Sequence, residues 1–207
     1  MRLPSAFLLL INGRMGRQLH VIARSVATTV AIAIAYFGLA RVGQLLAIPP
    51  GNVTPIWPAS GFALWIALGS FRFGWIGIWL GNFLANTWAF VDVSTANDAV
   101  RTILTGLCIG PGDLLQAYGG AYLLRRCIPA PGGFTSIREV GCFVASQSVA
   151  CTASATLGVT ALCGGGIIGW KEFGYTWLTW YLGDGFGVIV VAPVLMVWQS
   201  RSGMAHL

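Results

Sequence analysis

Two aspartates lie inside long apolar stretches of this chain, and they are the residues best placed to do chemistry. Asp184 sits in the run from Tyr175 to Trp198, and Asp113 sits in a second such stretch. Keeping an ionisable side chain at mid-bilayer costs roughly 2.5–3.5 kcal/mol on insertion scales, so an acid kept there indicates a functional role. We expect such carboxyl groups to set the polarity or the protonation of an internal cavity.

The composition defines the class of protein that must position these acids. Hydrophobic residues make up 56% of the 207 residues and charged residues 9%, with a mean hydropathy of +0.76. This is too little polar surface for a water-soluble globule and predicts an integral membrane protein. About six spanning helices fit, since each needs roughly 20 residues. The net charge of +6 is better explained by topology than by nucleic-acid binding.

The apolar stretches predict an all-α polytopic bundle. The expected spans are residues 25–48, about 58–71, 73–91, 99–124, 137–162 and 173–198, with the first ending at Pro49, Pro50 and Gly51. We expect a cytoplasmic N-terminal tail over residues 1–24, the membrane domain over residues 25–199 and a C-terminal tail over residues 200–207. Both termini are expected in the cytoplasm because most arginines then fall on that side, leaving Arg101 and Lys171 outside.

Strong hydrogen-bonding side chains occupy the middle of four consecutive spans. At ~1.5 Å per residue, Asp113 and Asp184 lie roughly 21 and 17 Å below the outer ends of their helices. Groups facing lipid would be unsatisfied, so we expect them to turn inward. The glycines around Asp184 could also allow local unwinding of its helix. The residues expected to bind a ligand are Asp113, Asp184, Asn82, Asn86, Gln116, Gln147, Trp57 and Tyr181.

Some of these residues have a structural alternative. Asn82, Asn86 and Gln147 could serve only as interhelical hydrogen bonds, each worth about 0.6 kcal/mol. Most tryptophans are expected to anchor the membrane interfaces.

Catalysis, metal binding and cofactor binding are not expected. Ser60 lies in P-A-S-G, but no histidine falls within a span to act as its base. The only histidines are His20 and His206, and the five cysteines form no C-x-x-C pair. The sequence therefore predicts a protein that is not an enzyme and that holds no metal or cofactor.

Four sequence blocks occur in an order that resembles a known family. Residues 48–65, 75–86, 112–126 and 180–198 are similar to the blocks of the bacterial membrane-associated sensor domain of the first type. The resemblance implies a multi-pass inner-membrane input domain, usually followed by a histidine kinase, diguanylate cyclase or phosphodiesterase. Family acids in the fourth and sixth helices match Asp113 and Asp184. The chain departs from the family by ending at Leu207 without an output module.

The sequence thus predicts a membrane sensor that binds a small ligand in a mid-membrane cavity and relays a helix shift. Its partners would be the lipid bilayer and a histidine kinase or diguanylate cyclase of two-component or cyclic-di-GMP signalling, or a second copy of the chain. The alternative is a transport subunit, such as the substrate-binding component of a vitamin importer, which also uses about six helices. A purely structural subunit of a larger membrane protein is a third possibility.

Overall fold

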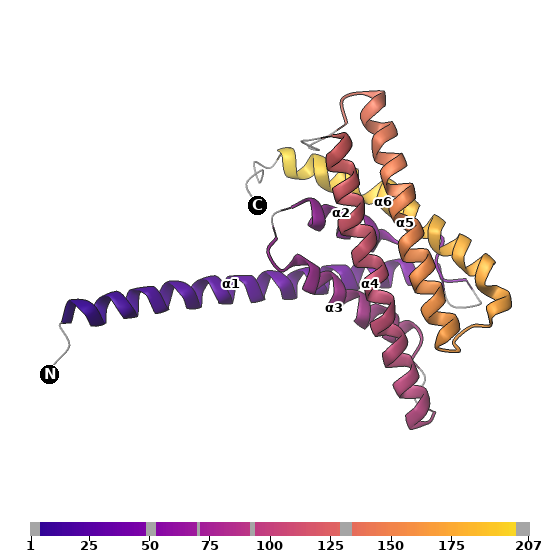
Figure 1. The fold of residues 1–207 in the computed structure, drawn as a ribbon, viewed down its shortest axis with the longest axis horizontal. Helices are drawn as coiled ribbons and strands as arrows, with labels where there is room; N and C mark the ends of the chain where they lie inside the picture. The colour runs from indigo at the N-terminus through magenta and orange to yellow at the C-terminus, as the bar shows by residue number, and fades with distance from the viewer. Residues whose placement is uncertain (1–4, 49–52, 70, 92–93, 129–133, 202–207) are drawn as a thin grey trace.

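The computed structural model describes residues 5–48, 53–69, 71–91, 94–128 and 134–201, with side chains from residue 18 onward. Within these ranges the fold is all-α, as predicted, and it contains no β-strand (Figure 1). The helices are α1 (Ser5–Gln44), α2 (Pro58–Leu68), α3 (Gly74–Ala89), α4 (Ala96–Cys127), α5 (Ile137–Gly164) and α6 (Phe173–Arg201), with the short 3₁₀ helix η1 (Trp170–Glu172) before α6. The turn predicted at Pro49, Pro50 and Gly51 and most of the predicted C-terminal tail lie outside the described residues.

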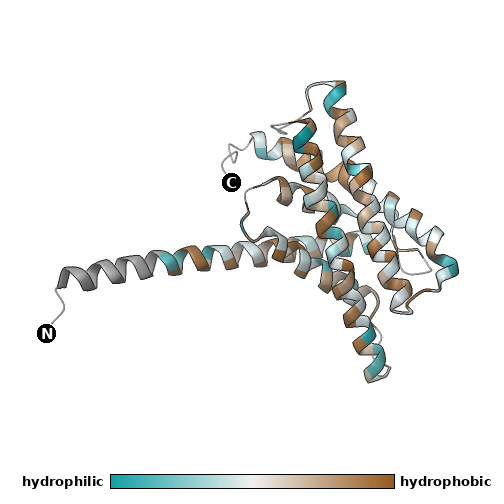
Figure 2. Ribbon diagram, viewed as in Figure 1, coloured by the Kyte–Doolittle hydropathy of each residue, from teal (hydrophilic) through white to brown (hydrophobic). Residues whose placement is uncertain are grey.

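The helices differ in their capacity to cross a bilayer. Among the described residues, three segments have the length and apolar composition of a span, namely Gln18–Gln44, Ile137–Gly164 and Trp170–Ser200. Helix α2 has 11 residues, which is about 16 Å of helix against about 30 Å of hydrocarbon. Helix α1 begins at Ser5, within the expected N-terminal tail, and its first half projects from the bundle (Figure 1). Hydrophilic residues gather toward the ends of α4, α5 and α6 (Figure 2).

Small residues let the backbones of neighbouring helices approach closely. The main pairings are α4 with α5, α1 with α3, and α2 with α6. Where α3 meets α1, a Cβ on Gly77 would collide with Ile32, and one on Gly81 would collide with Tyr36. Glycine at both positions therefore removes the side chains that would hold α3 away from α1.

An extended segment, residues 53–57, enters the bundle and lies against α6. The Trp57 N–H donates to the Gly183 carbonyl at 2.9 Å, and Gly187 leaves room for the Trp57 carbonyl. Pro58 then opens α2 within its first turn, where its missing N–H costs nothing. Non-helical backbone at membrane depth is tolerated when protein covers it. Helix α6 itself stays helical from Phe173 to Arg201, so the unwinding considered around Asp184 does not occur.

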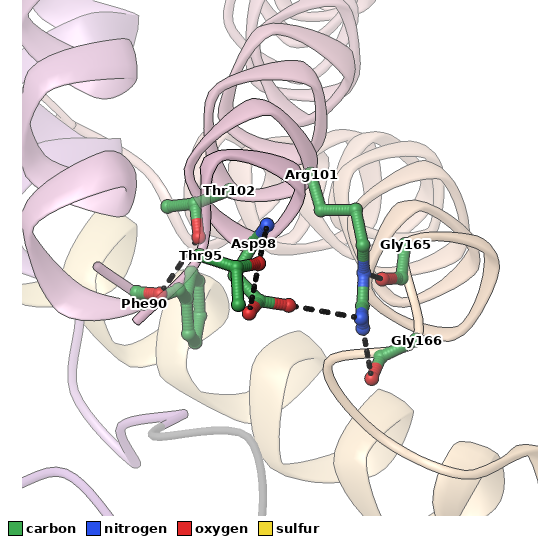
Figure 3. Close-up of polar contacts among 7 residues, drawn as sticks. All are labelled: Phe90, Thr95, Asp98, Arg101, Thr102, Gly165 and Gly166. Atoms are coloured by element: carbon green, nitrogen blue, oxygen red, sulfur yellow. Dashed lines mark hydrogen bonds and ion pairs between the residues drawn. The ribbon is translucent and has the colours of Figure 1, made fainter. Parts of the chain in front are cut away.

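The N-terminal end of α4 is tied to the C-terminal end of α5 (Figure 3). Thr95 caps α4 by accepting a hydrogen bond from the Asp98 N–H at 3.2 Å. Arg101 donates to the carbonyls of Gly165 and Gly166, both at 2.9 Å, and pairs with Asp98 at 3.5 Å. The bonds from Arg101 thus give hydrogen-bond partners to two carbonyls just beyond the end of α5.

The left-handed residue at this junction is Gly166, with φ of 66°. Its N–H donates to the Cys163 carbonyl at 3.0 Å, and the Ile167 N–H donates to the Leu162 carbonyl at 2.9 Å. This is the Schellman arrangement, in which a residue with positive φ closes the helix and glycine is strongly preferred.

We expect Gly166→Ala to lower the free energy of unfolding by about 1–2 kcal/mol, because a left-handed conformation is strained for any residue with a Cβ. The new Cβ would also press on the Arg101 guanidinium. Gly164→Ala is the matched control, since a Cβ there meets no atom within 4 Å. Thermal unfolding in detergent measures both variants, and equal midpoints would contradict the assigned cap.

Candidate functional site

Asp113 lies at the centre of the bundle and collects hydrogen bonds from three other helices. It is 5% exposed. Its Oδ2 accepts from the Tyr36 hydroxyl of α1 at 2.7 Å and from the Asn82 amide of α3, while its Oδ1 accepts from the Ser154 hydroxyl of α5 at 2.7 Å. One carboxylate on α4 thus joins α1, α3 and α5.

Asp184 lies nearby but is less completely paired. It is 1% exposed, and its Oδ1 accepts from the Ser60 hydroxyl of α2 at 2.5 Å. Its Oδ2 has no hydrogen-bond partner among the described residues. Trp180 donates to the Ser154 hydroxyl at 3.0 Å, and both of these side chains lie close to Asp184. The two acids therefore belong to one interior cluster linked through Ser154.

A small hollow opens beside Asp184, with an accessible volume of about 30 Å³. It lies where the C-terminal ends of α1 and α3 meet the extended segment and α6, and its lining residues are Gln44, Val53, Thr54, Trp57, Asn86, Ala89, Phe90, Trp180 and Asp184. In the orientation expected from the arginines, this is the outer half of the bundle. By contrast, the space around Asp113 admits no water-sized group.

The eight residues predicted to bind a ligand occupy three different places. Asp184, Asn86 and Trp57 line the hollow. Asp113, Asn82 and Gln116 are packed in the centre, each no more than 5% exposed. Gln147 and Tyr181 line a separate, largely apolar groove of about 180 Å³ between α5 and α6.

The amides in the centre and the groove also make bonds between helices. Gln147 of α5 donates to the Gly120 carbonyl of α4 at 3.2 Å, and Gln116 donates to the Cys151 sulfur at 3.5 Å. Asn82 bonds to Asp113 and to Tyr36. Such bonds between helices are what Asn82 and Gln147 would make if their role were only to hold the bundle together.

Four residues of the cluster were not predicted as ligand-binding residues: Tyr36, Ser60, Ser154 and Trp180. Serines and tyrosines are unremarkable in membrane helices, and only the fold shows that these hydroxyls meet a carboxylate. Trp180 was expected with the interfacial tryptophans, yet its indole N–H points to Ser154 in the interior. Its spacing of four residues from Asp184 was the available signal, because such residues share a helix face.

Six α-helices within the described residues pack around a buried carboxylate cluster, and with the apolar composition they define an integral membrane domain. The MASE1 family model matches residues 28–202, and the chain belongs to this family of membrane-associated sensor domains. The predicted resemblance is thereby confirmed. Comparisons with curated proteins and with solved structures gave no significant match.

Proposed function

We propose that this chain is a sensory input domain that binds a small ligand in the hollow beside Asp184 and relays its presence to a cytoplasmic output partner. The observation that carries the proposal is the Asp184 carboxyl group, buried at the wall of a hollow, with one oxygen that has no hydrogen-bond partner among the described residues. A buried carboxyl group with an unsatisfied oxygen is costly. A ligand that completed its coordination would therefore gain binding free energy from this group.

The relay would run along the pair formed by α2 and α6. Ser60 joins α2 to Asp184 of α6, and at the far end of α2 the Trp65 indole donates to Gln199 at 2.7 Å. A ligand that draws the carboxylate away from Ser60 would shift α6 relative to α2. Ligands move such an equilibrium only through different contacts in the two states, and the Ser60 bond is one such contact.

The cellular setting proposed here is a multi-pass protein of the bacterial inner membrane with both termini in the cytoplasm. The partner would be a histidine kinase or a diguanylate cyclase, in two-component or cyclic-di-GMP signalling, or a second copy of the chain. No catalytic role is proposed, because sensor domains of this family act through the output that they control.

The test is an in-frame fusion of the chain to a cytoplasmic diguanylate cyclase, with cyclic-di-GMP as the measurement. We expect Asp184→Asn to change the output about fivefold or more, the range typical of allosteric coupling, because the Asn side chain keeps an acceptor for Ser60 but loses the charge. Asp98→Asn is the control, since Asp98 lies near the start of α4 and is not among the residues that line the hollow.

Unchanged output in a correctly inserted Asp184→Asn fusion would contradict the proposal.

An uptake assay distinguishes the sensor proposal from the transport alternative. If deletion of the chain abolishes import of a labelled metabolite that the restored chain recovers, a transport subunit is the better description.

A further inference from the structure

The hollow has aromatic walls around a single carboxylate. Trp57, Phe90 and Trp180 contribute rings, and Asp184 contributes the only ionisable group among the described lining residues. The two indole N–H groups are already engaged, Trp57 with the Tyr36 hydroxyl at 3.4 Å and Trp180 with Ser154 at 3.0 Å. What these rings can offer a guest is therefore their π surface, which attracts cations.

The Asp184 carboxyl group has no basic partner in the part of the chain that the structure describes. The one ion pair formed there joins Arg101 and Asp98 at the end of α4. Arg41 reaches the rim of the hollow through a 2.5 Å bond to Gln44, but its guanidinium also lies 5.3 Å from the Trp88 ring centroid. Arg41 is thus held by Gln44 and Trp88, and Asp184 keeps an uncompensated carboxylate oxygen.

The wall chemistry distinguishes among classes of ligand. An anion would be repelled by the carboxylate at close range. A metal ion would find one carboxylate, the amides of Gln44 and Asn86 and the hydroxyl of Thr54. The described residues contain no group of three His, Cys, Asp or Glu side chains that could hold one. An ammonium group matches both features, since its positive charge can pair with the carboxylate, through a hydrogen bond where it carries an N–H, and it can lie against the rings.

We infer that the hollow is a binding site for an organic cation whose ammonium head lies between Asp184 and the indole rings of Trp57 and Trp180. This inference rests on the proposed function for the location of the ligand and adds its chemical class. The volume of about 30 Å³ admits a head group of a few heavy atoms, since about 10–15 Å³ of accessible volume holds one water.

The experiment uses the full chain in nanodiscs of phosphatidylglycerol, which carries no ammonium group. The probes are methylammonium, tetramethylammonium and choline, compared with 3,3-dimethyl-1-butanol, the uncharged carbon analogue of choline. The measurements are tryptophan fluorescence and the thermal unfolding midpoint. We expect saturable binding of at least one cation, with the neutral analogue bound about tenfold more weakly or not at all.

Two variants locate the site. Asp184→Asn should weaken cation binding about tenfold or more while leaving the weak response to the neutral analogue unchanged. Trp57→Leu should also weaken it, whereas Trp170→Leu, which alters a tryptophan that is 64% exposed and outside the hollow, should not. The comparison of choline with its neutral analogue on the unmodified chain does not depend on either variant folding.

Each outcome of these measurements either supports or overturns one of the two proposals. Equal binding of choline and its analogue, unchanged cation binding in Asp184→Asn, or no saturable response to any of the three cations would overturn the inference. A response to phosphatidylcholine added to the nanodisc, or to the free cation, supports an ammonium site, and the comparison tells which source supplies it. If binding fails while Asp184→Asn still alters the fusion's output, the sensor proposal stands without this ligand class. If cations bind as expected and Asp184→Asn leaves the output of the fusion unchanged, the sensor proposal fails and the inferred cation site stands.

Discussion

Gly187→Ala is expected to lower the free energy of unfolding by about 3 kcal/mol, the upper end of the usual cost of overpacking. A Cβ at this position would overlap the carbonyl group of Trp57. That carbonyl belongs to the backbone of the extended segment, which the bond from the Trp57 N–H to Gly183 holds against α6. Neither side of the contact can move without breaking that bond, so the added methyl group should separate the segment from the helix.

Gly185→Ala provides the matched control on the same helix. A Cβ at Gly185 meets no atom within 4 Å, so this variant should unfold at the same midpoint as the unmodified chain or slightly above it, since alanine favours helix. The measurement is the unfolding midpoint of the purified protein in detergent, followed by circular dichroism. Similar midpoints for the Gly187 and Gly185 variants would show that the segment does not pack as described.

This contact also matters for function, because the segment forms one wall of the hollow beside Asp184. Val53, Thr54 and Trp57 line that wall. Their positions depend on two glycines four residues apart on one face of α6, Gly183 and Gly187. If the backbone of the extended segment could not lie so near to α6, the hollow would not form, even with every polar side chain in place.

The sequence was sufficient to predict the helical class, the family and the inward placement of both acids. The length and composition of the hydrophobic runs determine the helical class. The cost of exposing a carboxylate to lipid determines the inward placement of the acids. Both Asp113 and Asp184 are at least 95% buried. These two predictions succeed because they depend on local composition and on the bilayer alone, whereas the family was recognised from four sequence blocks in their order.

The division of the polar residues among three places was beyond sequence reasoning. Depth estimates put Asn82, Asp113, Gln147 and Asp184 near one level, but level does not specify rotation about each helix axis. Rotation is fixed by the close glycine contacts between α1 and α3 and between α6 and the extended segment. The same limit applies to Ser154, whose hydroxyl contacts Asp113 only because α4 and α5 pack along their lengths.

Asp113→Leu is expected to have the other large effect, a loss of about 3 kcal/mol in the free energy of unfolding. The leucine side chain removes the acceptor for three buried donors at once, from Tyr36, Asn82 and Ser154. Each bond between membrane helices is worth about 0.6 kcal/mol on average, and each buried donor left without a partner adds about 1–3 kcal/mol where it finds no other. The loss should therefore exceed that of any single-donor variant, such as Tyr36→Phe.

Asp113→Asn removes the ionisable carboxyl group but keeps a side chain that can form hydrogen bonds. The variant therefore tests whether the central cluster has a structural role or binds the ligand. The hydroxyls of Tyr36 and Ser154 can turn to accept from the new amide, and Asn82 carries an oxygen with no partner among the described residues that could do the same after a flip. We therefore expect this variant to keep most of the stability that Asp113→Leu loses. Asp98→Asn, an acid-to-amide change outside the cluster, is the control. Because the centre around Asp113 has no room for a guest, cation binding at Asp184 should persist in Asp113→Asn. Its loss there, at unchanged stability, would place Asp113 in the ligand site and contradict the structural role assigned to it.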